Sequence, residues 1–314
     1  MTLDPEYLEY PNRRLGYDHG LYDWSCLFER PAISWPDGKA VAVWFVIDLE
    51  WFPLTPTDKP FRAPSHMATP FPDFRNYTAR EYGTRIGLYR LLDAFEARGI
   101  AVSVAANGAI AERYPEVIED IVAGGHEIIA HSVDMNHTVA TGLPEDEERA
   151  LIGRTLASLE KVAGTRPRGW LSIARSQSWN TLPLLAEAGI DYACDWVNDE
   201  LPYRMNAAGG GLVNIPLNHE LSDRDIILTH QALVDSYVEQ VSDACDWLST
   251  EARTYGGRML PLNLTPYVMG LPHRIVQFEG LLDTLAARPD IWFARGDALL
   301  DAWNASQAAS GPAT

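Results

Sequence analysis

Two carboxylates end an apolar segment of the chain, where residues 40–47 (AVAVWFVI) are followed by Asp48 and Glu50. Side chains two positions apart on a strand point to the same face of a sheet. Such a pair can bind a metal ion, or one acid can act as a general base while the other orients it. The bulky Trp51 and Phe52 that follow would partly desolvate both acids, which favours a functional site over a solvated strand end.

The segment HEIIAH, from His126 to His131, is the second candidate. Zinc-protease helices space their histidines four residues apart, whereas these are five apart, so that motif is excluded. The segment follows two glycines and has the character of a strand, on which positions 126 and 131 face opposite ways. We therefore expect His131 at the site and His126 in a structural role.

Further donor atoms follow His131, because Asn136 and His137 could converge on the same point. The predicted metal ligands are Glu50, His131 and His137, with Asn136 as the alternative to His137. Carboxylate and imidazole ligands suit zinc, so the predicted cofactor is one divalent metal ion, or none if the ligands fail to converge.

Polar residues also follow the other predicted strands, at the end where a parallel β/α barrel carries its chemistry. An arginine or asparagine there can hold a carbonyl or carboxylate group, and an aspartate can orient a cation. Each could instead be a cap or turn residue. The candidates are Asn107, Ser172, Arg175, Asp195, Asn218 and His219.

Several classes of protein are excluded by what the sequence lacks. It has no G-x-S-x-G, phosphate-loop or G-x-G-x-x-G motif, which removes support for serine hydrolases, kinases and dehydrogenases. Among 314 residues, 43 Asp and Glu against 25 Lys and Arg give a formal charge of −18. That excess disfavours nucleic acid as a partner, and no apolar run is long enough for a membrane span. We expect a cytoplasmic protein with a small-molecule substrate and three reduced cysteines.

Short apolar runs alternate with helical patterns along the chain, which predicts an α/β protein with a parallel sheet, either a barrel or doubly wound. The predicted strands are 40–47, 101–105, 127–130, 169–173, 192–194, 212–216, 259–264 and 291–293. The predicted helices are 84–98, 115–123, 145–162, 181–188, 232–254 and 275–287.

Two regions depart from this β-α rhythm. Residues 1–39 are polar, aromatic and turn-rich, so we predict an N-terminal extension before a single barrel domain at 40–304 and a flexible tail at 305–314. Residues 51–75 are proline-rich and too long for a simple connector, which favours a lid or an oligomer contact. Both regions expose aromatic side chains, so we expect a homo-oligomer.

Between about Trp35 and Trp303 the sequence resembles the polysaccharide deacetylase superfamily, including its intracellular branch of metal-free allantoinases and peptidoglycan-deacetylase-like proteins. The resemblance implies a distorted (β/α) barrel. The segments that carry it are PDGKAVAVWFVIDLEWFP, REYGTRIG, GHEIIAHS, RPRGW, NTLPLLAEAGIDYACDW, NDELPY and TPYVMGLPHR.

The resemblance also implies roles for single residues. Asp48 matches the family's base, Glu50 its metal-binding acid and His131 the first histidine of its second motif, whereas Met135 replaces the second metal histidine. Thr265 stands where the family has its acid histidine, and threonine cannot act as a general acid near neutral pH. His219, His273 or a water would then supply that proton. Trp170 and Tyr267, within the matched segments, join Asn107, Ser172, Arg175 and Asp195 as predicted substrate contacts.

These observations predict a hydrolase of a non-peptide C–N bond, acting on an amide or cyclic amide of a small molecule. In that mechanism Asp48 deprotonates a water, His131 stabilises the oxyanion, and Asn107 or Arg175 fixes the substrate. A metal-dependent N-deacetylase of an amino sugar and a catalytically silent binding protein on the same fold are the alternatives.

Overall fold

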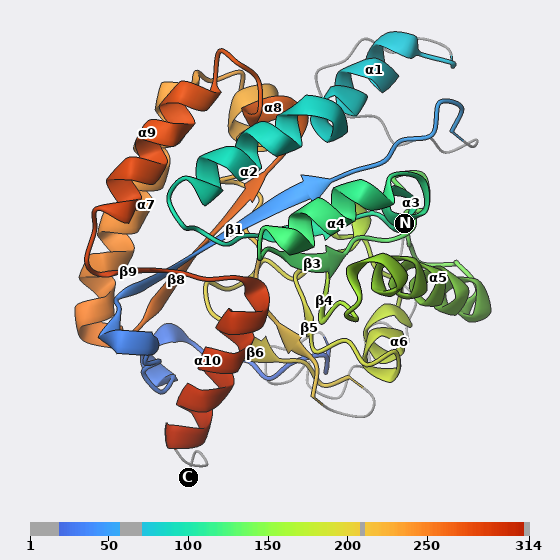
Figure 1. The fold of residues 1–314 in the computed structure, drawn as a ribbon. Coiled ribbons are helices and arrows are strands. Elements are labelled where there is room, and N and C mark those ends of the chain that lie inside the picture. Colours follow the sequence, from blue (N-terminus) through green and yellow to red (C-terminus); the bar gives the residue numbers. More distant parts are fainter. Residues whose placement is uncertain (1–18, 57–70, 208–210, 311–314) are drawn as a thin grey trace, which may run out of the picture.

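Strand β1 (Val41–Leu49) is the second strand from one end of a curled, nearly parallel sheet (Figure 1). The computed structural model describes residues 19–56, 71–207 and 211–310. The strand order is β6-β7-β5-β4-β3-β2-β1-β8, β9 adds to β1, and only β6 runs antiparallel to its neighbour among the described strands. The other strands are β2 (Ser103–Ala106), β3 (Glu127–Ala130), β4 (Gly169–Trp170), β5 (Tyr192–Ala193), β6 (Tyr203–Arg204), β7 (Val213–Asn214), β8 (Arg258–Leu264) and β9 (Ile291–Phe293).

Helices surround the outer face of this sheet, and α10 crosses one end (Figure 1). The expected barrel of the deacetylase type is thus confirmed as an open, curled sheet whose described end strands are β6 and β8. The helices are α1 (Phe74–Tyr82), α2 (Leu88–Glu96), α3 (Gly108–Arg113), α4 (Pro115–Ala123), α5 (Glu145–Ala163), α6 (Thr181–Glu187), α7 (Val234–Tyr255), α8 (Pro266–Met269), α9 (Ile275–Ala286) and α10 (Gly296–Ser310).

Both faces of β1 are buried, which explains its unbroken apolar run. Phe45 and Ile47 pack against the outer helices, whereas Trp44 belongs to a second apolar cluster inside the curled sheet. Alternation along the strand places Asp48 on the same interior face as Trp44. The acid therefore stands where the interior opens at the carboxyl ends of the strands.

The opposite, amino-terminal end of the interior is closed by the N-terminal segment and α10. Trp35 is 2% exposed and its indole N–H donates to the carbonyl of Arg258, the first residue of β8, at 2.7 Å. The backbone N–H of Ser34 donates to Ser306 Oγ in α10 at 3.0 Å. Residues 33–35 of the predicted extension thus pack on the barrel, and residues 1–18 lie outside the described part.

The first helix begins ten residues earlier than predicted, at Phe74, and continues through a π-helical turn at Gly83–Gly87 into α2. Asp73 caps it, since its carboxylate accepts a hydrogen bond from the N–H of Asn76 at 3.0 Å. A Cβ on Gly87 would lie 2.1 Å from the carbonyl oxygen of Pro266. Glycine therefore permits the close approach of α8 to this helix.

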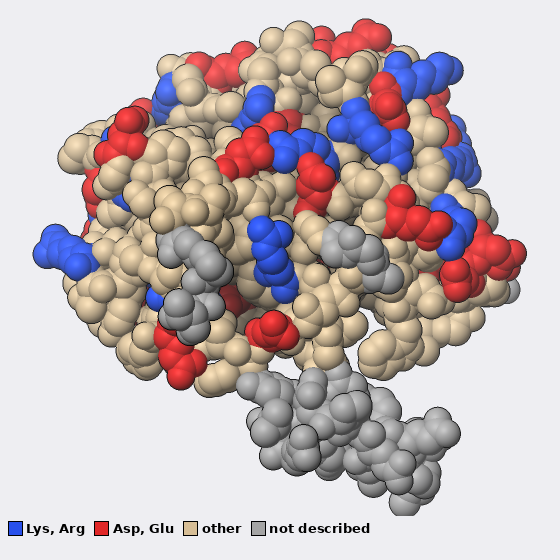
Figure 2. Space-filling view, turned by 90° about the horizontal axis from the view of Figure 1, so that it is seen from below, with Lys and Arg blue, Asp and Glu red and all other residues tan. Residues whose placement is uncertain are grey.

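The predicted tail needs a correction, because α10 extends to Ser310 and residues 305–310 are helical. Of the proposed lid, residues 57–70 lie outside the described part, and 74 and 75 belong to α1. No helix in the described ranges combines the length and apolarity needed to span a membrane. On the face shown in Figure 2, basic and acidic side chains are interspersed.

Candidate active site

Asp48 is 7% exposed and lies on β1 beside the parallel strands β2 and β8. Asn263 of β8 donates to its Oδ1 at 2.8 Å and so fixes the carboxylate. Burial raises the pKa of Asp48 above its ordinary value, while Arg224 and His131 partly oppose the shift. The carboxyl is therefore a stronger proton acceptor than an exposed aspartate, which suits a general base.

His131 follows β3 and is 3% exposed. Its Nδ1 lies 2.7 Å from the carbonyl oxygen of Leu171, which only accepts, so Nδ1 carries the proton in the neutral ring. Nε2 is buried and has no hydrogen-bond partner among the described residues. Nε2 is thus the ring nitrogen left to contact a ligand in the cavity, as an acceptor in the neutral ring or as a donor in the protonated ring.

Arg224 is the residue that the sequence reasoning missed. It opens the π-helix Arg224–Thr229, and its Nη2 lies 2.7 Å from Glu50 Oε1 and 3.8 Å from Asp48 Oδ2. Tyr267 donates to the other oxygen of Glu50 at 3.0 Å. A lone arginine ten positions after β7 belongs to no sequence motif, so only its place beyond a strand end hinted at a role.

Arg175 and Ser172 follow β4 and line the same cavity. The Nε and Nη2 groups of Arg175 donate to the carbonyl of Leu217 at 3.2 and 3.0 Å. Ala174 and Arg175 both have φ of 53°, a strained conformation that proteins retain mainly at functional sites. Asp195 supports this turn, because its carboxylate accepts from the N–H and the hydroxyl of Ser172, both at 2.7 Å.

These side chains surround one cavity of about 340 Å³. Its position at the carboxyl ends of the strands is where β/α folds carry their chemistry. The predicted catalytic residues Asp48, His131 and His219 all line it, with Glu50, Ser172 and Arg175. The remaining described lining residues are Met135, Leu171, Ala174, Ser222, Arg224, Asp225, Thr229 and Asn263.

Three predicted substrate contacts are not among the described lining residues, and their contacts show why. Asn107 holds the backbone instead, accepting from Trp51 N–H at 2.7 Å and donating to the carbonyl of His131. Trp170 is 1% exposed and packs in the outer cluster. Asp195 supports Ser172 from behind. We correct these three from substrate contacts to positioning residues.

Tyr267, Asn136 and His137 also lie apart from the catalytic cavity. The Tyr267 hydroxyl donates to Glu50, and the Tyr267 ring lies 5.7 Å from the Arg224 guanidinium carbon. Asn136 borders a separate small hollow of about 30 Å³. His137 Nδ1 lies 2.6 Å from Asp134 Oδ1, and that interaction raises the pKa of His137. The predicted ligand His137 is therefore not brought to Glu50 and His131, because the loop turns it toward Asp134.

Thr265 is buried behind the cavity and is 1% exposed. Its backbone N–H donates to both carboxylate oxygens of Asp223, at 3.0 and 2.9 Å. Burial raises the pKa of Asp223 to about 7. Because Asp223 directly precedes Arg224, this contact ties the π-helix to the turn after β8.

The curled parallel sheet thus carries an aspartate, a histidine and two arginines at the carboxyl end of its strands, as expected of a β/α hydrolase. A sequence profile described as Polysaccharide deacetylase matches residues 82–193. Over this segment the chain is similar to the polysaccharide deacetylase family. It is 25% identical over 301 residues, 86% of this chain and 92% of the relative, to a Schizosaccharomyces pombe protein whose name places it among the polysaccharide deacetylases.

Solved structures agree with this assignment. The crystal structure of Puue allantoinase superposes with a TM-score of 0.79 at 25% identity, covering 93% of this chain and all of the other. A Bacillus anthracis pseudoenzyme of the carbohydrate esterase family 4 shares the fold, with a TM-score of 0.50 and 11% identity over 83% of this chain and 66% of the other.

The resemblance to the deacetylases implies a divalent metal ion, and the side chains present here can be compared with the ligands that such an ion needs. Among the described residues, no three His, Cys, Asp or Glu side chains are grouped as metal ligands. Glu50 is instead paired with Arg224, and Met135 occupies the expected place of the second histidine. These residues do not fit a zinc site, because a fixed guanidinium already neutralises the carboxylate that would bind the ion.

Proposed function

We propose that this protein hydrolyses an amide or cyclic amide bond of a small molecule and uses the Arg224 guanidinium in place of a metal ion. The observation that carries the proposal is the convergence of Asp48, His131 and Arg224 on one cavity of about 340 Å³. A base, a hydrogen-bond acceptor and a fixed positive charge are the groups that water attack on a carbonyl requires.

The reaction begins with Asp48, which takes a proton from a water as the water oxygen bonds to the carbonyl carbon. The carbonyl electrons move to oxygen, and the guanidinium groups of Arg224 and Arg175 stabilise the negative charge. His131 Nε2 accepts a hydrogen bond from the water or from a substrate N–H. The C–N bond then breaks, and the nitrogen takes its proton from the Asp48 carboxyl or from His219.

The proposal is tested by incubating the protein, with and without divalent metal, with cyclic imides, ureides and N-acetyl sugars. Asp48→Asn should reduce turnover of the accepted substrate by about 10²- to 10⁴-fold while the unfolding temperature stays close to wild type. Asp134→Asn is the matched control, because Asp134 is a buried aspartate outside the cavity. Wild-type rates in Asp48→Asn would remove the base assignment, and turnover that requires added zinc would favour the metal-dependent deacetylase.

Thr265 favours one second candidate, a binding protein without turnover. Thr265 stands where the resemblance implies a histidine that acts as general acid, and this buried threonine cannot supply that proton. Calorimetric binding of a panel compound without product over hours would support this function. A cytoplasmic location and a homo-oligomer stay predictions.

A further inference from the structure

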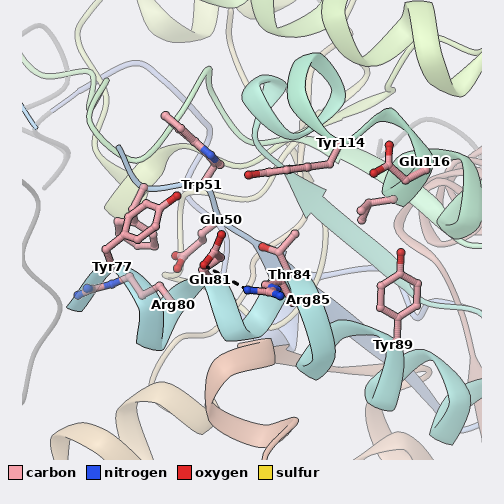
Figure 3. Close-up of a pocket in the computed structure, with 12 residues that line it drawn as sticks. Glu50, Trp51, Tyr77, Arg80, Glu81, Thr84, Arg85, Tyr89, Tyr114 and Glu116 are labelled. Carbon is pink, nitrogen blue, oxygen red and sulfur yellow. Dashed lines mark ion pairs between the residues drawn. The ribbon is translucent and has the colours of Figure 1, made fainter. Parts of the chain in front are cut away.

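A second cavity, of about 310 Å³, shares only Glu50 with the described lining of the catalytic cavity. Figure 3 shows the continuous helix from α1 to α2 on one side, carrying Tyr77, Arg80 and Tyr89. Trp51 and Tyr114 lie opposite that helix. The cavity has the size of a small-molecule site at the lower end of the usual range.

The walls of this second cavity are rich in aromatic side chains. Trp51, Tyr77 and Tyr114 all line it, and Trp51 is further supported by the Arg113 guanidinium, 4.2 Å from its ring. Aromatic side chains pack against flat rings in offset or edge-to-face arrangements. The walls therefore suit a planar ring.

Arg80 provides the polar end of the cavity. It is only 7% exposed, it lies 4.5 Å from the centre of the Phe52 ring, and its Nη1 donates to the carbonyl of Asn76 at 2.9 Å. Its Nε is buried without a hydrogen-bond partner, and no described carboxylate forms an ion pair with it. A buried cation without a counter-ion is unfavourable, so a ligand anion here would be stabilised.

The acids of the cavity do not oppose an anion at the Arg80 end. Glu50 is neutralised by Arg224, and Glu81 lies 3.9 Å from Arg85. Glu116 stands at the end of the cavity farthest from Arg80 (Figure 3). The cavity is therefore polarised, positive at Arg80 and negative at the far end.

We infer that this cavity is a second binding site, for an aromatic carboxylate. The ring lies among Trp51, Tyr77 and Tyr114, and the carboxylate bonds to the Arg80 guanidinium. Arginine suits this contact because its planar fork matches the two carboxylate oxygens.

Indole-3-acetate and tryptamine test the inference, because they share one ring and carry opposite charges. Calorimetry on the full chain should give a dissociation constant at least about tenfold lower for the acid. Arg80→Met should weaken acid binding by about tenfold or more. The control Arg149→Gln should change it less than about twofold, since Arg149 lies on α5, is 47% exposed and is not among the described residues that line the cavity. Thr84→Phe, which fills the cavity without altering Arg80, should abolish binding.

Thermal unfolding shows whether each variant is folded. If Arg80→Met does not fold, the binding measured with Thr84→Phe tests the inference. Equal or tighter binding of tryptamine, no binding of the acid at millimolar concentration, or unchanged binding in Thr84→Phe would overturn the inference. Loss of binding in Arg224→Met with binding kept in Thr84→Phe would also overturn it, since the acid would then occupy the catalytic cavity.

Discussion

Arg224 and Glu50 are 174 positions apart in the chain, yet Nη2 of the arginine lies 2.7 Å from Oε1 of the glutamate. The glutamate side chain is 2% exposed and that of the arginine 21%. A pair with so little solvent access is held in place, and it sets the charge of the catalytic cavity.

Arg224→Met should lower kcat/KM by about 10²- to 10³-fold, because the cation facing the developing oxyanion is lost. Removing the charge also raises the pKa of Asp48 further, so the acidic limb of the pH–rate profile should move to higher pH. The profile is measured as kcat/KM against pH. Arg224→Lys is the control, since it keeps the charge but not the planar fork, and should lose less activity. An unshifted acidic limb in Arg224→Met would contradict the coupling.

Chelation should leave activity unchanged, because Arg224 rather than a metal neutralises Glu50. The measurement is turnover before and after dialysis against EDTA, together with elemental analysis of the active protein. Stoichiometric zinc whose removal abolishes turnover would show that the guanidinium has no such role.

Glu127 should make stability depend on pH. It is buried against Tyr192, whose hydroxyl donates to it at 2.7 Å, and burial raises its pKa from 4.5 to about 7. The folded state then binds more protons than the unfolded state between these values, so its stabilising contribution is complete below pH 4.5 and is lost as pH rises toward 7.

The loss should be at most about 3 kcal/mol in the free energy of unfolding, measured by urea denaturation from pH 4.5 to 8. Glu127→Gln is the control, because its amide cannot ionise and the wild-type decrease should be absent. Parallel curves for the two proteins would refute the assignment.

Gly87→Ala should destabilise the fold by about 1–3 kcal/mol, since the new Cβ would meet the Pro266 carbonyl oxygen. The shift of α8 should also move Tyr267 from Glu50. Gly153→Ala in α5 is the matched control, because nothing lies within 4 Å of its added Cβ. Gly153→Ala should raise the free energy of unfolding by up to about 1 kcal/mol, as measured by urea denaturation. Equal effects of the two substitutions would show that Gly87 is not in close contact with Pro266.

Local periodicity accounts for what could be predicted. The two-residue spacing of Asp48 and Glu50 places them on one face, and the five-residue spacing of His126 and His131 separates them. His126 is buried but is not among the described residues that line the catalytic cavity, and its Nδ1 accepts a hydrogen bond from the N–H of Val102 at 3.1 Å. Alternating apolar segments likewise predicted a β/α fold, because strand and helix periods are properties of neighbouring residues.

Contacts between distant segments were decided only by the tertiary structure. Arg224 meets Glu50 because the π-helix packs against the turn after β8, an arrangement that Asp223 and Thr265 hold. His137 turned to Asp134 because a three-residue separation in a loop permits that bond. The sequence by itself determined which residues share a strand face, whereas burial and long-range packing determined which charges meet, since these depend on segments with no fixed relation along the chain.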